Sequence, residues 1–159
     1  MEFGGQDITI ELRKLLADRH INIELADAKL LKERIAFVRK HEKGYSNFIP
    51  PENEYKDDFI RSFELPDGTE IICENKILAD ACELLCKNDK FLPKGLVEMT
   101  YDSIRLCDDS INKELTNNII IAGGTSMLQG IVISTLNTMK EDMISTLNIM
   151  NEDDILKFM

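Results

Sequence analysis

"NNIIIAGGTSMLQGI", residues 117–131, joins three consecutive isoleucines to a glycine pair, two hydroxyl residues and an apolar run of helical spacing. The isoleucines predict a strand at 118–122 that is apolar on both faces, as in the centre of a helix-covered parallel sheet. Glycine lets a backbone approach a ligand closely, and the N–H groups at a helix start favour anions. The stretch therefore predicts a strand, a tight turn that could contact a ligand, and a helix.

By itself this turn is weakly diagnostic, because most glycine pairs after a strand are ordinary loop geometry. The stretch contains neither the Gly-Lys-Ser/Thr ending of a P-loop nor the G-x-G-x-x-G dinucleotide fingerprint. Whether the turn belongs to a nucleotide site therefore depends on motifs elsewhere in the chain.

Composition limits the classes of function. The chain has 159 residues, 43% of them hydrophobic and 30% charged, which fits one globular domain or one and a half small ones. A net charge of -10 argues against direct nucleic-acid binding, which draws its affinity from clustered Lys and Arg. No apolar stretch is long enough to span a membrane and the N-terminus has no signal core, so we expect a soluble, cytoplasmic protein without a membrane partner.

The cysteines and basic residues are interpreted structurally. Four cysteines are too few for a disulfide framework, so we expect buried free thiols in a reducing compartment: Cys73, Cys82, Cys86 and Cys107. Cys82 and Cys86 are one helical turn apart but lack two further ligands, so no metal site is predicted. The basic residues interleave with acids and predict a solvated helix face: Lys29, Lys32, Arg34, Arg39 and Lys40.

Hydrophobic periodicity and turn residues predict the elements. A helix follows Gly4 and Gly5, a pair that suggests close backbone contact, and its apolar residues are Ile8, Ile10, Leu12, Leu15 and Leu16. Further elements are a helix over 24–40, a hairpin over 59–74 that turns at Pro66, Asp67 and Gly68, a helix over 75–89, and a short helix over 100–111 capped by Thr100 or Asp102.

A long helix is predicted after Gly130. Within it "ISTLNTMKED" at 133–142 recurs as "ISTLNIMNED" at 144–153, displaced by 11 residues. Eleven residues are close to three helical turns, so both copies place their apolar side chains on one face. We interpret this Met-rich face as core or as a docking surface.

No catalytic residue is predicted. The sequence has no nucleophile elbow, no His-Glu-x-x-His motif, and only two histidines. The acidic pairs Asp57–Asp58 and Asp108–Asp109 are interpreted as solvated surface.

Four segments in order resemble the second half of an actin or actin-related protein: "FGGQDITIELRKLL" at 3–16, "LLKERIAFV" at 30–38, "FELPDGTEIICENKILADACELL" at 63–85, and the stretch from Tyr101 to Ile131. The resemblance implies a mostly helical α+β or α/β fold of the ribonuclease H-like ATPase superfamily. Residues 5–90 would form a fourth-subdomain-like region with a hairpin near 58–74. Residues 91–159 would form part of the third subdomain, with the strand 118–122 and the long C-terminal helix.

The resemblance also implies a nucleotide-binding set. Lys29, Lys32 and Glu33 match a helix that touches adenosine from one side. The turn that supports the nucleotide from the other side is matched by Gly123, Gly124, Thr125 and Met127. Leu128 and Gln129 replace an aromatic residue and a proline.

The phosphate-binding hairpins and metal-placing carboxylates of the family have no counterpart in these residues. Phosphoryl transfer needs charge stabilisation and an aligned water, so we expect no catalysis and no cofactor for this chain alone. ATP or ADP with Mg²⁺ would require the missing half.

The functional hypothesis is a divergent actin-related protein or fragment that works by protein–protein contact in a cytoskeletal assembly, with that assembly or another actin-family subunit as partner. Its "GGTSML" wording resembles divergent members, such as the pointed-end subunit of dynactin, more than conventional actin. Three alternatives stay open: part of an ATP-binding or ATP-hydrolysing actin-like protein, a nuclear subunit of a chromatin-remodelling complex, and a small helical domain that keeps actin-like sequence without actin-like function.

Overall fold

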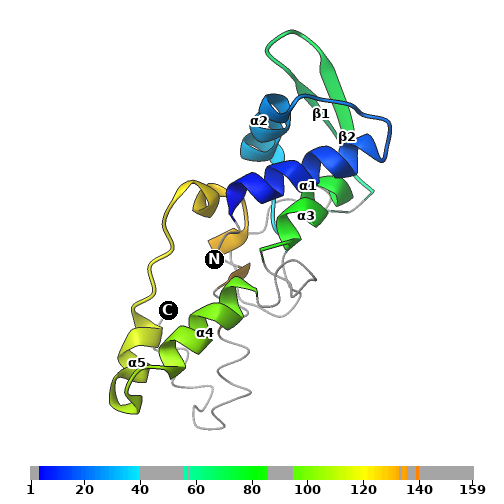
Figure 1. Cartoon of the computed structure of the whole chain (residues 1–159). Helices are drawn as coiled ribbons and strands as arrows, with labels where there is room; N and C mark the ends of the chain where they lie inside the picture. Colours follow the sequence, from blue (N-terminus) through cyan, green and yellow to red (C-terminus); the bar gives the residue numbers. More distant parts are fainter. Residues whose placement is uncertain are drawn as a thin grey trace.

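Three helices and a hairpin form one end of the molecule, and two further helices form the other (Figure 1). The computed structural model describes residues 4–39, 56, 58–85, 95–132, 134, 135 and 139. The helices are α1 (Gly5–Ala17), α2 (Leu25–Ile35), α3 (Asn75–Glu83), α4 (Leu96–Arg105), α5 (Asp109–Asn117) and the 3-10 turn η2 (Gly124–Met127). The strands are β1 (Ile60–Glu64) and β2 (Glu70–Glu74). The described chain is therefore mostly helical, with one two-stranded sheet.

Helix α1 forms because its apolar residues recur every four positions. Ile8, Leu12 and Leu16 are completely buried on one face. Ile10 is 48% exposed, because residues two positions apart lie on opposite sides of a helix. At the N-terminus the Asp7 carboxylate accepts the Gly4 N–H at 2.7 Å, which satisfies a donor that the helix leaves free.

The C-terminal end of α1 is a Schellman turn. Ile21 N–H donates to Leu16 O, and His20 N–H donates to Ala17 O, both at 2.9 Å. His20 adopts the left-handed conformation with φ 63°, a position that usually favours glycine.

Helix α2 ends earlier than predicted. Ala36 is already extended, Phe37 pairs in parallel with Gln129, and Val38 N–H donates to Gln129 O at 2.8 Å. The prediction of a helix through residue 40 is wrong at this end, because the aromatic and β-branched side chains of Phe37 and Val38 become buried in an extended segment. This segment links α2 to the residues after η2.

The hairpin is confirmed with its predicted turn. Its antiparallel register runs from Ile60 opposite Glu74 to Glu64 opposite Glu70. Gly68 has φ 84°, and the Asp67 carboxylate accepts the Thr69 N–H at 2.9 Å. Hydrogen bonds from the N–H and from the hydroxyl of Thr69 hold the pKa of Asp67 below its usual value.

Polar contacts tie the neighbouring elements to α3. Asn75 is completely buried; its N–H donates to Phe59 O at 2.8 Å, and its Oδ1 accepts from Arg61 Nε at 2.7 Å. Arg39, which follows α2, pairs with Asp80 at 2.6 Å and with Glu83. Arg39 therefore holds α3 through these two ion pairs. The expectation that it lies on a solvated basic face is wrong.

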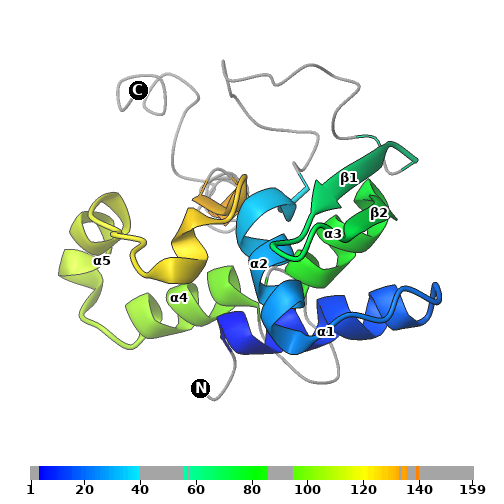
Figure 2. The ribbon, with the colours of Figure 1, turned by 90° about the horizontal axis from the view of Figure 1, so that it is seen from above.

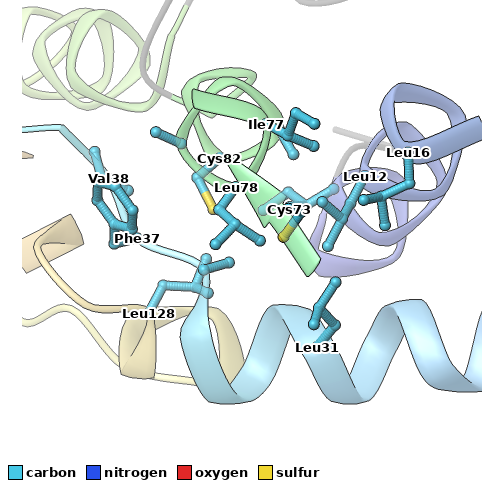
Figure 3. Close-up of a cluster of buried hydrophobic side chains, with 14 of the residues drawn as sticks. Leu12, Leu16, Leu31, Phe37, Val38, Cys73, Ile77, Leu78, Cys82 and Leu128 are labelled. Atoms are coloured by element: carbon cyan, nitrogen blue, oxygen red, sulfur yellow. The ribbon is translucent and has the colours of Figure 1, made fainter. Parts of the chain in front are cut away.

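The core lies between α1, α2, α3 and β2 (Figure 3). Leu12 and Leu16 enter it from α1, and Leu31 enters from α2. Each such leucine contributes roughly 1.5–3 kcal/mol when it leaves water. Other members come from later in the chain, among them Ile77, Leu78, Leu128 and Ile131. The core thus joins residues near 8 to residues near 130.

Two of the predicted buried thiols are inside this core. Cys73 and Cys82 are buried, and burial raises the pKa of Cys73 to about 11. Cys107 is exposed, which corrects the expectation for that residue, because it follows the end of α4 on the surface. Cys86 lies outside the described residues.

The predicted short helix over 100–111 is wrong in its bounds and caps. Helix α4 begins at Leu96, and Thr100 lies inside it, donating its hydroxyl to Leu96 O at 2.8 Å. A separate helix, α5, follows, and its cap is Asp108, whose carboxylate accepts the Ser110 N–H at 2.9 Å. Hydrogen bonds from the hydroxyl and from the N–H of Ser110 lower the pKa of Asp108. Both Asp108 and Asp109 are exposed, in agreement with their interpretation as surface residues.

The strand predicted at 118–122 does not form. The segment connects α5 to η2 without joining a sheet, and Ile120 is 90% exposed. A strand needs a neighbour for its backbone hydrogen bonds, and the described part of the chain supplies none here.

The chain after Gly130 is helical where it is described, at 131, 132, 134, 135 and 139. Ile131 and Met139 are buried, and Tyr101 of α4 donates its hydroxyl to Met139 O. The remainder of the predicted long helix, with most of its duplicated unit, lies outside the described residues. None of the described helices is long and apolar enough to cross a membrane.

Candidate functional site

Lys32 occupies the last turn of α2 and turns inward. Only 8% of the residue is exposed. Its Nζ donates to Gly5 O at 2.9 Å and to Thr9 Oγ1 at 3.1 Å. Because the Thr9 hydroxyl also donates to Gly5 O at 3.0 Å, the three groups form a closed hydrogen-bonded cluster between α1 and α2. The expectation that Lys32 lies on a solvated face is wrong: a buried charged group needs such partners.

Gly5 is the point where this cluster meets the glycine turn. A Cβ atom built on Gly5 would lie 2.8 Å from Thr125 Oγ1 and 3.5 Å from Lys32 Nζ. The absence of a side chain therefore allows η2 to approach the start of α1. In Figure 2, the start of α1, the last turn of α2 and the turn after the yellow segment can be followed toward the middle of the molecule. Two members of the predicted nucleotide set, Lys32 and Thr125, thus meet at Gly5.

Lys29 and Glu33 have a different environment. They lie four residues apart on α2, with Lys29 Nζ 4.0 Å from Glu33 Oε1. Their side chains are 61% and 53% exposed. An exposed pair of this kind contributes only a few tenths of a kcal/mol (about 0.3–0.5) to helix stability, so both side chains are available for a ligand or a partner protein.

The glycine turn itself is open on its outer side. Gly123 has φ 108°, and neither Gly123 nor Gly124 has another atom within 4 Å of where a Cβ would lie. Ser126 closes the turn by donating its N–H and its hydroxyl to Gly123 O at 3.1 and 2.6 Å. Met127 is 84% exposed. The turn therefore presents glycine backbone and one large apolar side chain to solvent.

Leu128 and Gln129 follow the glycine turn and make contacts inside the molecule. Leu128 is 7% exposed and belongs to the core, where Figure 3 shows it beside Phe37 and Val38. Gln129 pairs with Phe37 through the backbone. The position that the resemblance assigns to an aromatic side chain is thus used for internal packing.

A comparison with protein-family models shows which family the chain belongs to. The model for actin matches residues 24–149, well over half of the chain. The chain belongs to the actin family. The match covers α2, the hairpin and the glycine turn, which carry three of the four segments on which the resemblance was based.

Two residues that shape this cluster were not in the predicted set. Gly5 could be found from the sequence, because the Gly4–Gly5 pair signals close backbone contact; the structure places that contact at Gly5, while Gly4 has open space around it. Thr9 carried no signal, since a hydroxyl inside an amphipathic helix usually bonds to its own backbone.

The described residues that meet here supply hydrogen-bond donors and acceptors. No cluster of three or more His, Cys, Asp or Glu side chains that could hold a metal is found among them. Lys32 and Thr125 are donors, Glu33 is an acceptor, and the glycine backbone at Gly123 can approach a ligand closely. Such a set can position a polar molecule or a partner segment.

Proposed function

We propose that this actin-family chain works through protein–protein contact in a cytoskeletal assembly, without catalysis of its own. In this proposal the residues that the family resemblance assigns to the nucleotide have a structural role, a brace in which Lys32 holds α1 against α2. The correspondence of residues 5–90 to the fourth actin subdomain, and of 91–159 to part of the third, belongs to the same proposal.

The bonding of Lys32 carries this proposal. An ammonium group has three N–H donors, and two of those of Lys32 are directed at Gly5 O and Thr9 Oγ1. A ligand that needed Lys32 would have to compete with a buried cluster that also holds α1 against α2. The burial of Leu128 supports the same conclusion, because adenine loses a packing surface on that side.

ATP binding is the second candidate, and one observation favours it. The two segments that the family resemblance assigns to opposite sides of the nucleotide approach each other at Gly5, through Lys32 and Thr125. The exposed Glu33 and the open backbone at Gly123 and Gly124 could then contact a ligand without disturbing the brace.

A nucleotide titration separates the two candidates. The purified chain is melted with increasing ATP, with and without Mg²⁺. A ligand at a hundredfold excess over its Kd stabilises the folded state by about 2.7 kcal/mol. Under the brace proposal we expect no change of melting temperature up to millimolar ATP.

A rise of melting temperature at micromolar ATP would overturn the brace proposal and establish a nucleotide site. Glu33→Gln and Lys29→Met are suitable variants in that case. Both side chains are exposed, so a loss of the ATP response without a loss of basal stability would locate the ligand on α2.

A further inference from the structure

The turn of the hairpin holds the only Asp-Gly pair of the sequence, Asp67–Gly68, and the sequence has no Asn-Gly pair. Both residues are exposed, and nothing but the chain neighbours of Gly68 lies within 4 Å of where its Cβ would be. In Figure 1 the turn is the loop that joins β1 to β2 and projects from the molecule. An aspartate before glycine cyclises readily, because no side chain shields the glycine nitrogen. The turn is therefore the place in this chain where such a reaction is easiest.

The reaction forms a bond between Gly68 N and Asp67 Cγ. The hydroxyl of the protonated carboxyl group leaves as water with the amide proton, and a five-membered succinimide ring closes. Water then opens the ring. Addition at Cγ restores aspartate, whereas addition at the main-chain carbonyl leaves a chain that runs through Cγ, which is isoaspartate. One water leaves and one returns, so the conversion is an isomerisation that needs no oxidant and no cofactor.

In the folded turn both reacting groups are bonded elsewhere. Gly68 N–H donates to Leu65 O at 2.9 Å, and the Asp67 carboxylate accepts the Thr69 N–H at 2.9 Å. With the positive φ of Gly68, this is the pattern of a type I turn followed by a left-handed glycine. In such a turn Asp67 has a ψ of about 0°. Ring closure needs Asp67 to rotate away from this conformation, so that Gly68 N faces Cγ.

The ionisation of Asp67 acts in the same direction. The hydrogen bonds from Thr69 that hold the pKa of Asp67 below its usual value keep the carboxyl group ionised. A carboxylate anion is a poorer target for a nucleophile than a neutral carboxylic acid. The contacts to Thr69 therefore hold Asp67 both in an unreactive position and in its less reactive form.

We propose that Asp67 is a site of isoaspartate formation that the hairpin turn gates: the closed turn holds the pair unreactive, and opening of the turn starts the reaction. Isoaspartate adds a CH₂ group to the main chain, so the modified turn no longer fits the pairing of Leu65 with Thr69. Leu65 is 5% exposed and belongs to the core, so the change is felt there. The reaction takes place within the chain and is independent of its cytoskeletal role.

Peptide mapping of aged protein tests the proposal. The full chain is incubated at neutral pH, folded in buffer and unfolded in urea, and then digested with trypsin. Cleavage after Arg61 and Lys76 releases residues 62–76 as one peptide. Its isoaspartyl form has the same mass, separates by liquid chromatography, and is labelled by a carboxyl methyltransferase specific for isoaspartyl residues. We expect the folded chain to react more than about tenfold more slowly, since only the open fraction of the turn reacts.

Thr69→Val identifies the contact that gates the reaction. It removes the hydroxyl that donates to the Asp67 carboxylate, so the folded variant should form isoaspartate several-fold faster than the natural chain. Ser62→Ala is the matched control, because it removes an exposed hydroxyl of β1 from the same tryptic peptide but away from the turn. It should react like the natural chain, and all three should react equally in urea. Circular dichroism confirms that each variant is folded.

The proposal is overturned if the folded and unfolded natural chains react at the same rate, or if no isoaspartate forms at residue 67 in urea. Equal rates for folded Thr69→Val and Ser62→Ala would overturn the role of the Thr69 hydroxyl. None of these outcomes depends on the ATP titration.

Discussion

Lys29 and Lys32 lie one turn apart on α2 and have opposite environments. The side chain of Lys29 is 61% exposed, whereas Lys32 is 8% exposed and donates to Gly5 and Thr9. The same residue type is therefore a surface charge at one position and an internal brace at the other. The difference follows from the approach of α1, which supplies the acceptors on one side of α2 only.

Lys32→Met should destabilise the protein, and Lys29→Met should not. Methionine is unbranched and of similar length, so the first change removes the hydrogen bonds with little change of volume. Bonds made by a charged donor contribute about 1.5–3 kcal/mol each to a comparison of this kind, and we expect a loss near the lower end for the cluster. Urea unfolding measures it.

The control, Lys29→Met, should stay within about 0.5 kcal/mol, as most exposed substitutions do. Equal stability of the two variants would show that the Lys32 cluster contributes nothing, and the brace proposal would lose its main support.

At the scale of elements, the contact between the end of α2 and the chain after η2 depends on Gly130. Its φ is 86°, and a Cβ atom there would lie 2.6 Å from Val38 O. Phe37 and Val38 can pair with Gln129 only because this backbone comes so close. Glycine is required here for two independent reasons, conformation and space.

Gly130→Ala should therefore destabilise the fold by about 2–4 kcal/mol, from left-handed strain and from overpacking against Val38. Gly124→Ala is the matched control: Gly124 has no positive φ and no neighbour within 4 Å of a Cβ, so its free energy of unfolding should change by no more than about 0.5 kcal/mol. Urea midpoints of the two variants give the comparison. Similar losses in both would contradict the role assigned to the Val38 contact.

At the scale of the whole molecule, stability is distributed unevenly between the two ends. The core connects α1, α2, α3, the hairpin and residues near 130, whereas α5 has no buried residue. Helix α4 is linked to the core by the hydrogen bond from Leu96 N–H to Leu85 O at 3.0 Å, whereas its own buried residue, Val97, is not a member of that core. The two ends should open with different free energies.

Hydrogen exchange followed by mass spectrometry should show this difference. Amides of α1 and α3 should exchange slowest, at rates set by global unfolding, and amides of α5 should exchange fastest among the helices through local opening. Protection of α5 equal to that of α1 would mean that α5 is held by contacts outside the described residues.

The predictions that succeeded rest on residues close together in the sequence. The spacing of Ile8, Leu12 and Leu16 defines the buried face of α1, and Pro66, Asp67 and Gly68 define the hairpin turn. The order of four segments pointed to the actin family, and the family match confirms it. Of the candidate site, Lys32 and Thr125 came from that resemblance, and Gly5 was signalled by the glycine pair.

The predictions that failed concern contacts between residues that are far apart in the sequence. Gly5 and Lys32 are 27 residues apart, and the bridge that ends α2 joins Phe37 to Gln129. Residues 118–122 have the composition of a buried strand but find no neighbour in the described chain. Periodicity and turn chemistry therefore determined the helices and the hairpin by themselves. Tertiary structure decided which lysine is buried, where α2 ends and that residues 118–122 do not join a sheet in the described chain, because burial and pairing depend on groups that only folding brings together.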